Sequence, residues 1–342
     1  MLFIKPVLKM ICCGVLFVLS MLSEDVAAQS NSSDEKEAIA MQRAYWEKMT
    51  LKNPSLRSVL VRSEFIPQHR INSKLNGSPY FTGDADLLRN SVQMRFPVIK
   101  WNNKSIDLTG SALNQRTVLT EVESFYPGNI DFEHKVSQTS LGIVAGFTMR
   151  SMLFKKRIIY RINFSSLFDS DFSQSQHSLI GVGLISLKSN AYTSLSVGLA
   201  IIASPTVKIP VFGLVSYEHT FTTLGLDLSA NLPYRLSLRK ELTARNALSF
   251  VNELGGPMFF YQTTGGYTVN QARLNMTELR TGLLWERRLG KILVCGVSFG
   301  CVNTFKSEIH NVVAFRDLGT VLKNEATFDY YFGLNFSVLS FR

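Results

Sequence analysis

Between Ile209 and Gly256 apolar and polar residues alternate through four short runs, and this alternation constrains the fold more than any other feature. In Leu224–Ser229 every second residue is a leucine, and Tyr234–Arg239 places apolar side chains at every second position in the same way. A period of two is typical of β-strands. One face of each strand is apolar and the other carries full charges, which a membrane barrel tolerates better than a soluble two-sheet core. A soluble β-sandwich is the alternative at the level of the fold.

The same period recurs along most of the chain and predicts fourteen strands. We therefore expect an all-β protein, a transmembrane antiparallel β-barrel of about 14 strands. The tight link Leu232-Pro233 leaves twelve strands as an alternative, because a hairpin over 223–240 is uncertain on sequence alone. The strand candidates are 56–66, 90–100, 105–126, 138–150, 157–167, 178–187, 193–203, 210–220, 223–231, 234–240, 246–254, 274–287, 291–302 and 326–339.

The connections between these strands alternate in length, which is a second and independent indication of a barrel. Barrels of the bacterial outer membrane have short turns on the periplasmic side and longer loops outside. If both termini lie in the periplasm, every long gap faces outward. The long gaps are 67–89, 127–137, 168–177, 255–273 and 303–325.

The first 28 residues have the features of an export signal. Lys5 and Lys9 precede a short apolar run, and small residues lead to Ala28. This predicts a signal peptide over 1–28, cleaved near Ala28, and residence in the outer membrane of a Gram-negative bacterium. We expect residues 29–54 to form a periplasmic segment and 55–342 to form the barrel. The segment is either a short helix, in the periplasm or packed in the barrel mouth, or a flexible leader.

The charge balance is basic but gives no sign of nucleic-acid binding. The net charge is +10, and no lysine-rich or aromatic-studded basic run is present. An exported basic chain fits an anionic membrane surface better, so the expected partners are outer-membrane lipid and lipopolysaccharide, with no nucleic acid. The sequence indicates no cofactor and no metal site.

Charged residues also occupy the face of the strands opposite the apolar one, and these are the candidate site residues. Both signs are present in similar number, whereas a strongly selective pore lines itself with one sign. We therefore predict an interior network of ion pairs, because buried charges must be paired. The predicted lumen-facing residues are Arg95, Arg161, Glu218, Asp227, Arg235, Arg239, Glu253, Glu278, Arg280, Glu286 and Asp329.

Catalytic chemistry has weak support. His219 is the one histidine placed near a strand end, where a hydrolase could use it with a neighbouring serine. The residues after it are Thr220, Phe221 and Thr222, and not the Ser-Asn-Gly pattern of outer-membrane phospholipases. We predict that the protein is not an enzyme. The aromatic run Met258–Tyr261 is interpreted as part of an outer aromatic girdle, with a ligand contact as the alternative.

Several short motifs resemble a family of Bacteroidota outer-membrane β-barrel proteins known as domain of unknown function 6268. They include Ser55–Arg57, Pro210–His219, Leu226–Leu228, Leu232-Pro233 with Leu238-Arg239, Asn246–Ser249 and Thr277–Arg280. The resemblance implies an outer-membrane barrel. It implies no catalytic or binding residue, because the family has no established activity.

These features favour a passive channel, or a barrel that transports or binds a small molecule. The alternatives are an adhesion protein that acts through its extracellular loops and, less favoured, a barrel lipase or protease. The last strand, 326–339, belongs to an aromatic-rich end that resembles the one recognised by barrel-assembly machinery, a further expected partner.

Overall fold

The computed structural model describes residues 47, 49–125, 135–204, 210–261, 272–313 and 316–339. These belong to a compact unit that begins at Glu47. The signal peptide predicted over 1–28, and the part of the predicted periplasmic segment that precedes Glu47, lie outside the described residues. A helical stretch ends at Lys52, and the short 3₁₀ helix Pro54–Leu56 follows.

The described residues after Leu56 are almost entirely β-strand. The strands are β1 (Val59–Leu75), β2 (Ser78–Trp101), β3 (Lys104–Ser124), β4 (Lys135–Leu153), β5 (Lys156–Asp169), β6 (Ser175–Ser189), β7 (Thr193–Ala203) and β8 (Val211–Phe221). They continue with β9 (Leu226–Leu232), β10 (Arg235–Glu241), β11 (Asn246–Gly255), β12 (Met258–Tyr261), β13 (Ala272–Leu289), β14 (Leu293–Val313), β15 (Arg316–Asn324) and β16 (Thr327–Val338).

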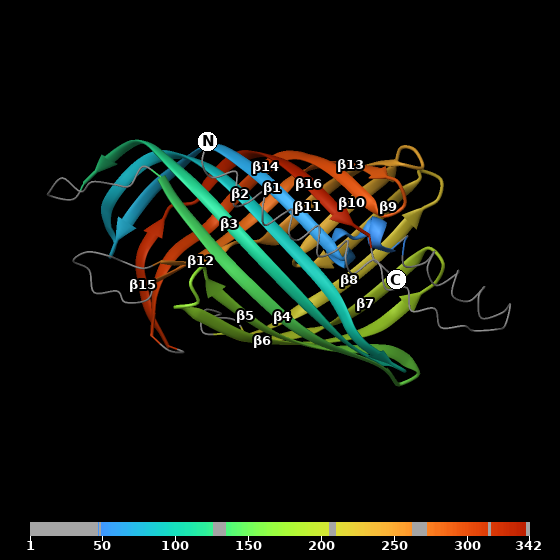
Figure 1. The fold of residues 1–342 in the computed structure, drawn as a ribbon. Helices are drawn as coiled ribbons and strands as arrows, with labels where there is room; N and C mark the ends of the chain where they lie inside the picture. Colours follow the sequence, from blue (N-terminus) through green and yellow to red (C-terminus); the bar gives the residue numbers. More distant parts are fainter. Residues whose placement is uncertain are drawn as a thin grey trace. The chain divides into compact units, whose positions relative to one another are not determined.

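Fourteen of these strands form one closed antiparallel barrel (Figure 1). The strands β1 to β11 pair in sequence order, each with its neighbour. The wall then continues through the pairs β11–β13, β13–β14 and β14–β16. The barrel closes where β1 pairs with β16, with Val59 opposite Val338 and Phe65 opposite Phe332. The predicted fold class is confirmed. Below, the terminal end is the end at which β1 begins and β16 ends, and the far end is the opposite one.

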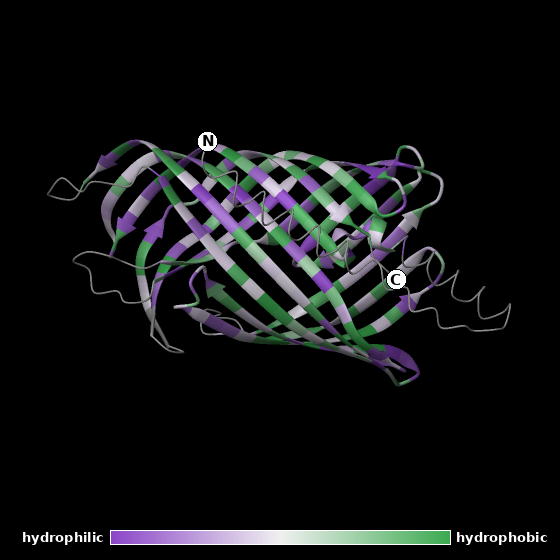
Figure 2. Cartoon of the chain, viewed as in Figure 1, coloured by the Kyte–Doolittle hydropathy of each residue, from purple (hydrophilic) through white to green (hydrophobic). Residues whose placement is uncertain are grey.

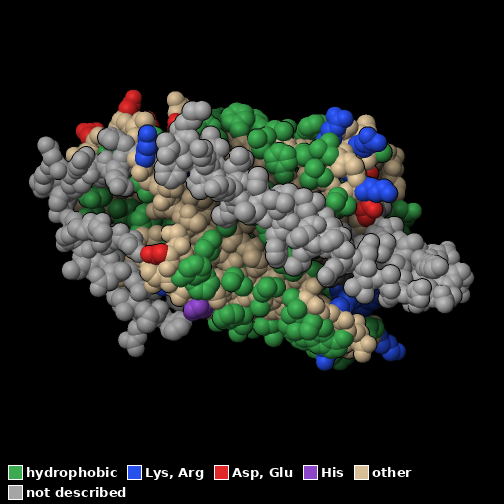
Figure 3. Space-filling view, viewed as in Figure 1, with side chains coloured by type: hydrophobic (Ala, Val, Ile, Leu, Met, Phe, Trp, Pro, Cys, Tyr) green, Lys and Arg blue, Asp and Glu red, His purple; other side chains and the backbone are tan. Residues whose placement is uncertain are grey.

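The outer face of the barrel is apolar. Along β16 the side chains of Phe328, Phe332 and Phe336 are exposed, whereas those of Asp329 and Ser337 are buried. Figure 2 shows this alternation along the strands, and Figure 3 shows hydrophobic side chains covering much of the outer wall in the same view. An apolar band around a closed barrel is the architecture of outer-membrane proteins. No helix in the described part of the chain has the length and hydropathy needed to cross a membrane.

The hairpin β9–β10 settles the number of strands. Arg239 pairs with Asp227 and Arg235 with Asn231, and only Pro233 and Tyr234 separate the two strands. The tight Leu232-Pro233 link is therefore a hairpin turn at the far end, and the alternative of twelve strands is wrong. Leu232 and Tyr234 are exposed on the tip of this hairpin.

The prediction of long loops at the far end is wrong for much of the described chain, because the strands themselves continue there. Residues 67–89 are not a loop: β1 runs to Leu75 and β2 begins at Ser78. Residues 303–325 contain the end of β14 and the whole of β15, which pairs with β14 and β1. Strand pairing rests on backbone hydrogen bonds, so it continues beyond the membrane where lipid no longer demands an apolar outer face.

A two-residue turn joins β1 to β2 at the far end. Asn76 has φ +48° and Gly77 has φ +89°. Two positive φ values at consecutive residues match the two-residue hairpin turn that suits the twist of antiparallel strands. The Asn-Gly pair is what permits a hairpin in place of the predicted loop.

Candidate functional site: a charged layer inside the barrel

The interior of the barrel is crossed by ion pairs between strands that are not neighbours in the sheet. Arg89 on β2 makes two hydrogen bonds of 2.7 Å to Glu278 on β13. Strands β1, β16 and β14 separate β2 from β13 around the barrel wall, so this pair spans the interior. The two side chains are 3% and 1% exposed. A bidentate pair between arginine and carboxylate is among the strongest polar contacts in proteins.

A second tightly bonded group lies nearer the terminal end. Glu286 on β13 accepts a 2.6 Å hydrogen bond from Arg57, which precedes β1, and another from Arg239 on β10. Arg57 also donates to Ser337 on β16 at 2.9 Å. Glu286 and both arginines are buried. One carboxylate therefore fixes three separate parts of the wall.

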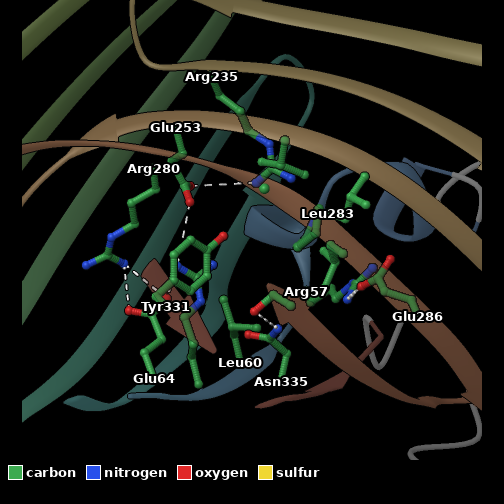
Figure 4. A pocket seen from close by; sticks show the side chains of 16 residues that line it. Arg57, Leu60, Glu64, Arg235, Glu253, Arg280, Leu283, Glu286, Tyr331 and Asn335 are labelled. Carbon is green, nitrogen blue, oxygen red and sulfur yellow. Dashed lines mark hydrogen bonds and ion pairs between the residues drawn. The ribbon is translucent and has the colours of Figure 1, made fainter. Parts of the chain in front are cut away.

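Between these two groups lies a set of charged side chains, some in close ion pairs and others at longer distances from their partners. Arg280 contacts Glu64 at 2.9 Å and Glu278 at 2.9 Å. Arg62, in contrast, approaches Glu64 only to 3.7 Å and Glu253 only to 3.6 Å. In Figure 4 Arg280 points towards Glu64, and Glu253 reaches across from the neighbouring strand.

Glu253 is the least tightly held carboxylate of this set. Its second partner, Arg235 on β10, is 3.7 Å away. The Glu253 side chain is 35% exposed, compared with 7% for Glu64. We call Arg62, Arg235 and Glu253 the loose trio. Contacts of this length contribute less than the hydrogen-bonded pairs on either side.

Two cavities meet at this position. The larger one has a volume of about 270 Å³ and extends towards the far end, past Arg89 and the segment Leu254–Pro257. The smaller one has a volume of about 40 Å³ and extends towards Arg57 and Glu286. Both cavities share four lining residues, which we call the central layer: Arg62, Glu64, Glu253 and Arg280. The central layer therefore separates the two spaces within the barrel.

The terminal end of the barrel is crossed by the segment that precedes β1. Lys52 forms an ion pair with Asp227 on β9 and also bonds Thr220 on β8. Arg288 at the end of β13 pairs with Glu47. The described part of the predicted periplasmic segment thus contacts the terminal ends of β8, β9 and β13.

Most of the predicted lumen-facing residues are brought into pairs. Arg235 and Glu253 contact each other in the loose trio, Glu278 contacts Arg280, and Arg239 contacts Glu286. Four further predicted residues are paired with residues outside the predicted set. Arg95 and Arg161 both bind Asp107, at 3.3 and 2.9 Å, Asp227 binds Lys52, and Asp329 binds His69 at 2.7 Å.

Glu218 stands apart from these groups. It lies on β8 opposite Ser194 of β7 and Ser229 of β9. Within the part of the chain that the structure describes, no ion pair is found for it. The structure does not join it to the central layer.

In most of these ion pairs at least one partner is absent from the predicted set. Arg89 and His69 lie on β2 and β1, in the stretch 67–89 for which the sequence predicts a loop, and a loop prediction assigns no inner face. Arg62 and Glu64 lie in a predicted strand, where they alternate with Val61, Ser63 and Phe65. That alternation is the signal that would have added both side chains to the predicted inner face, although the predicted set leaves them out.

Among the described residues, the side chain that bonds His219 is a threonine and not the serine that the hydrolase hypothesis calls for. The Nδ1 of His219 is 2.8 Å from the Thr193 hydroxyl, and its ring packs against Phe221 at 4.3 Å and stacks with Tyr217 at 6.3 Å. Tyr217 and Phe221 flank it at alternate positions of β8, so the three rings lie on one face. These contacts hold the imidazole ring between two aromatic rings and beside the Thr193 hydroxyl.

The aromatic run Met258–Tyr261 is not an outer girdle. Phe259 is fully buried and Phe260 is 8% exposed. The run forms β12, which pairs with β13 and lies against β4 and β5. Arg273 on β13 sits over the Phe260 ring and donates hydrogen bonds to Gln176 and to the Ser175 carbonyl on β6. These contacts join two parts of the wall at the far end.

Comparisons with known proteins give no family. No family model matches the chain, and no curated protein matches it. Among solved structures, the chain is similar to an outer-membrane channel of Pseudomonas putida F1, at 9% identity over 83% of this chain and 96% of that chain, with a TM-score of 0.36. It is also similar to the translocator domain of the autotransporter NalP from Neisseria meningitidis, at 9% identity over 89% and 97%, with a TM-score of 0.33.

A third similar structure is a Pseudomonas aeruginosa FadL homologue, at 10% identity over 83% of this chain and 90% of that chain, with a TM-score of 0.28. TM-scores this low carry no argument about function. The fold assignment here rests on the strand pairing and on the apolar outer band.

Proposed function

We propose that this protein is an outer-membrane barrel that transports or binds a small polar molecule through its interior. The observation that carries the proposal is the pair of cavities that meet at the central layer. Both cavities are lined by charged side chains, and the longest ion-pair contacts among the described interior residues, 3.6 and 3.7 Å, are made by Arg62 and Glu253 of the layer between them. A solute that separates the loose trio would pass from one cavity to the other.

Conductance across a planar lipid bilayer tests this proposal. Protein purified from outer membranes should give small, brief openings, because the tight pairs persist while the loose trio opens. Removing one partner in Arg62→Ala should lengthen the openings and increase the current. Silence of both proteins under voltage would contradict transport, and a matched Lys74→Ala variant at the far-end surface controls for general damage.

We also propose that the chain is exported by the signal peptide 1–28 and inserted among outer-membrane lipid and lipopolysaccharide by barrel-assembly machinery. The apolar outer band supports this placement. N-terminal sequencing of the mature protein should begin at Gln29. Slower migration on a detergent gel after boiling would separate a closed barrel from a soluble sandwich. The Bacteroidota family stays a prediction from the sequence.

Surface interaction is a second candidate function, favoured by the ordered sheet that extends beyond the apolar band. Exposed polar side chains such as Arg70 and Lys74 lie on β1 in this extension. Shortening the β1–β2 hairpin should then abolish binding to a host or bacterial surface. Hydrolysis is the least favoured function, and the His219→Ala variant should leave any esterase or protease signal of the preparation unchanged.

A further inference from the structure

We propose that the loose trio is a binding site for a small monocarboxylate with an apolar body, and that the bound carboxylate takes the place of Glu253 between Arg62 and Arg235. This inference deepens the proposed function, because it names a solute class for the same cavities. It rests on the contacts of Glu253, on the shape and lining of the larger cavity, and on the charges around it.

The first step concerns how Glu253 is held. Its carboxylate lies 3.6 Å from Arg62 and 3.7 Å from Arg235, and it is 35% exposed. The carboxylate of Glu278 makes contacts of 2.7 and 2.9 Å to its two arginines and is 1% exposed. Two arginines therefore share a carboxylate that neither holds at normal hydrogen-bond length. An incoming carboxylate can approach closer than Glu253 does.

The second step concerns the space beside the trio. The larger cavity borders Arg62 and Glu253 and has a volume of about 270 Å³. At about 30 Å³ per water molecule, this holds about nine waters or a compact organic acid. Leu113, Leu254 and Pro257 line the cavity together with Ser91. This lining matches an apolar body attached to a single charged group.

The third step concerns the sign of the charge. Three arginines and two glutamates line the larger cavity. Arg89 and Arg280 are each engaged in contacts of 2.9 Å or less, so Arg62 is the arginine with the weakest pairing. A guanidinium recognises a carboxylate through two parallel hydrogen bonds. The cavity therefore attracts an anion, and the Glu253 carboxylate competes with that anion for Arg62.

Isothermal titration of the purified barrel with benzoate tests this inference. The wild-type protein should bind benzoate weakly, because the ligand must displace Glu253. Glu253→Gln should bind about tenfold more tightly, because the competitor loses its charge, and Arg62→Gln should bind about tenfold more weakly than wild type. Glu253→Asp, which keeps the charge on a shorter side chain, should lie between wild type and Glu253→Gln.

Controls fix the chemistry of the site. Lys74→Gln should bind benzoate as the wild type does, because Lys74 pairs with Glu325 at the surface. Benzylamine, a cation of similar shape, should not bind. Binding of benzylamine that Glu253→Gln abolishes would overturn the proposal in favour of a cation site. Inorganic phosphate that binds as well as benzoate would overturn the requirement for an apolar body.

Conductance measured on the same samples separates this inference from the proposed function. Benzoate binding with the expected order of variants, but without conductance, would support the site and contradict transport. Conductance with no benzoate binding in wild type or Glu253→Gln would support a channel and overturn the carboxylate site.

Discussion

The tightly bonded groups around Glu278 and Glu286 differ from the loose trio around Glu253, although all three consist of one glutamate between two arginines. Each arginine around Glu278 and Glu286 donates a hydrogen bond of 2.5 to 2.9 Å to its carboxylate, and both carboxylates are at most 4% exposed. Glu253 is 3.6 and 3.7 Å from its arginines and is partly exposed. The same residue types therefore serve two purposes inside one barrel: the tight groups fix distant strands together, and the loose trio leaves its charges accessible.

The largest expected effect comes from Glu286→Ala. This change leaves Arg57 and Arg239 buried without their carboxylate. Breaking a buried ion pair by removing one partner costs about 3–5 kcal/mol. The midpoint of unfolding in urea should fall sharply, measured as the loss of heat-modifiable migration. An unchanged midpoint would mean that the tight group does not hold the wall together.

A smaller loss is expected from Glu278→Gln. Arg89 then loses both of its 2.7 Å bonds to a charged partner, whereas Arg280 keeps Glu64. The amide still accepts one hydrogen bond, so the destabilisation should be about 1.5–3 kcal/mol. Urea unfolding of this variant and of Glu286→Ala under the same conditions shows which of the two loses more stability. A larger loss than in Glu286→Ala would reverse the ranking of the two groups.

Glu253→Gln should change stability by less than about 1 kcal/mol, because partly exposed pairs at this distance contribute little. The same variant should nevertheless change conductance and benzoate binding more than Glu278→Gln does. Urea midpoints check the small change in stability, and bilayer currents measured on the same variants check the larger change in conductance. A stability loss as large as that of Glu278→Gln would show that the trio is structural after all.

The smallest effect is expected at the exposed pair of Lys74 and Glu325 beyond the apolar band. The hydrogen bond from Lys74 and its charge lower the pKa of Glu325. A lowered pKa in the folded protein means that the contribution is present at neutral pH and is lost as the pH falls through the folded value. Because the pair is fully solvated, Glu325→Gln should leave the urea midpoint unchanged at pH 7. A lower urea midpoint at pH 7 would contradict the view that only buried ion pairs contribute measurably to stability.

The sequence predicts the fold well wherever lipid selects the outer face. Phe328, Phe332 and Phe336 alternate because hydrocarbon requires apolar side chains there, and the strand and its inner face follow. Beyond the band this requirement ends, so the continuation of β1 to Leu75 carries no such alternation. The Asn76-Gly77 pair was the remaining indication that a hairpin, and not a loop, joins β1 to β2.

The sequence predicts which charged residues face the interior but not which of them form pairs. The inner face of each strand is readable, and it identified Glu253, Arg280 and Glu286. Which charges meet depends on closure of the barrel, since β2 meets β13 only across the interior. The difference between 2.7 Å at Glu278 and 3.6 Å at Glu253 depends on strand tilt and register, which alternation does not encode.

The seam between β1 and β16 joins the first strand of the barrel to the last. Until β16 has been synthesised and delivered, β15 can join β1 to β14 only at the far end, and the rest of both edges stays unpaired, which lipid does not tolerate. Closure therefore waits for the last strand, and bringing distant segments together makes this step slow. A chain that stops short of β16 should therefore yield an aggregating fragment and not a smaller barrel.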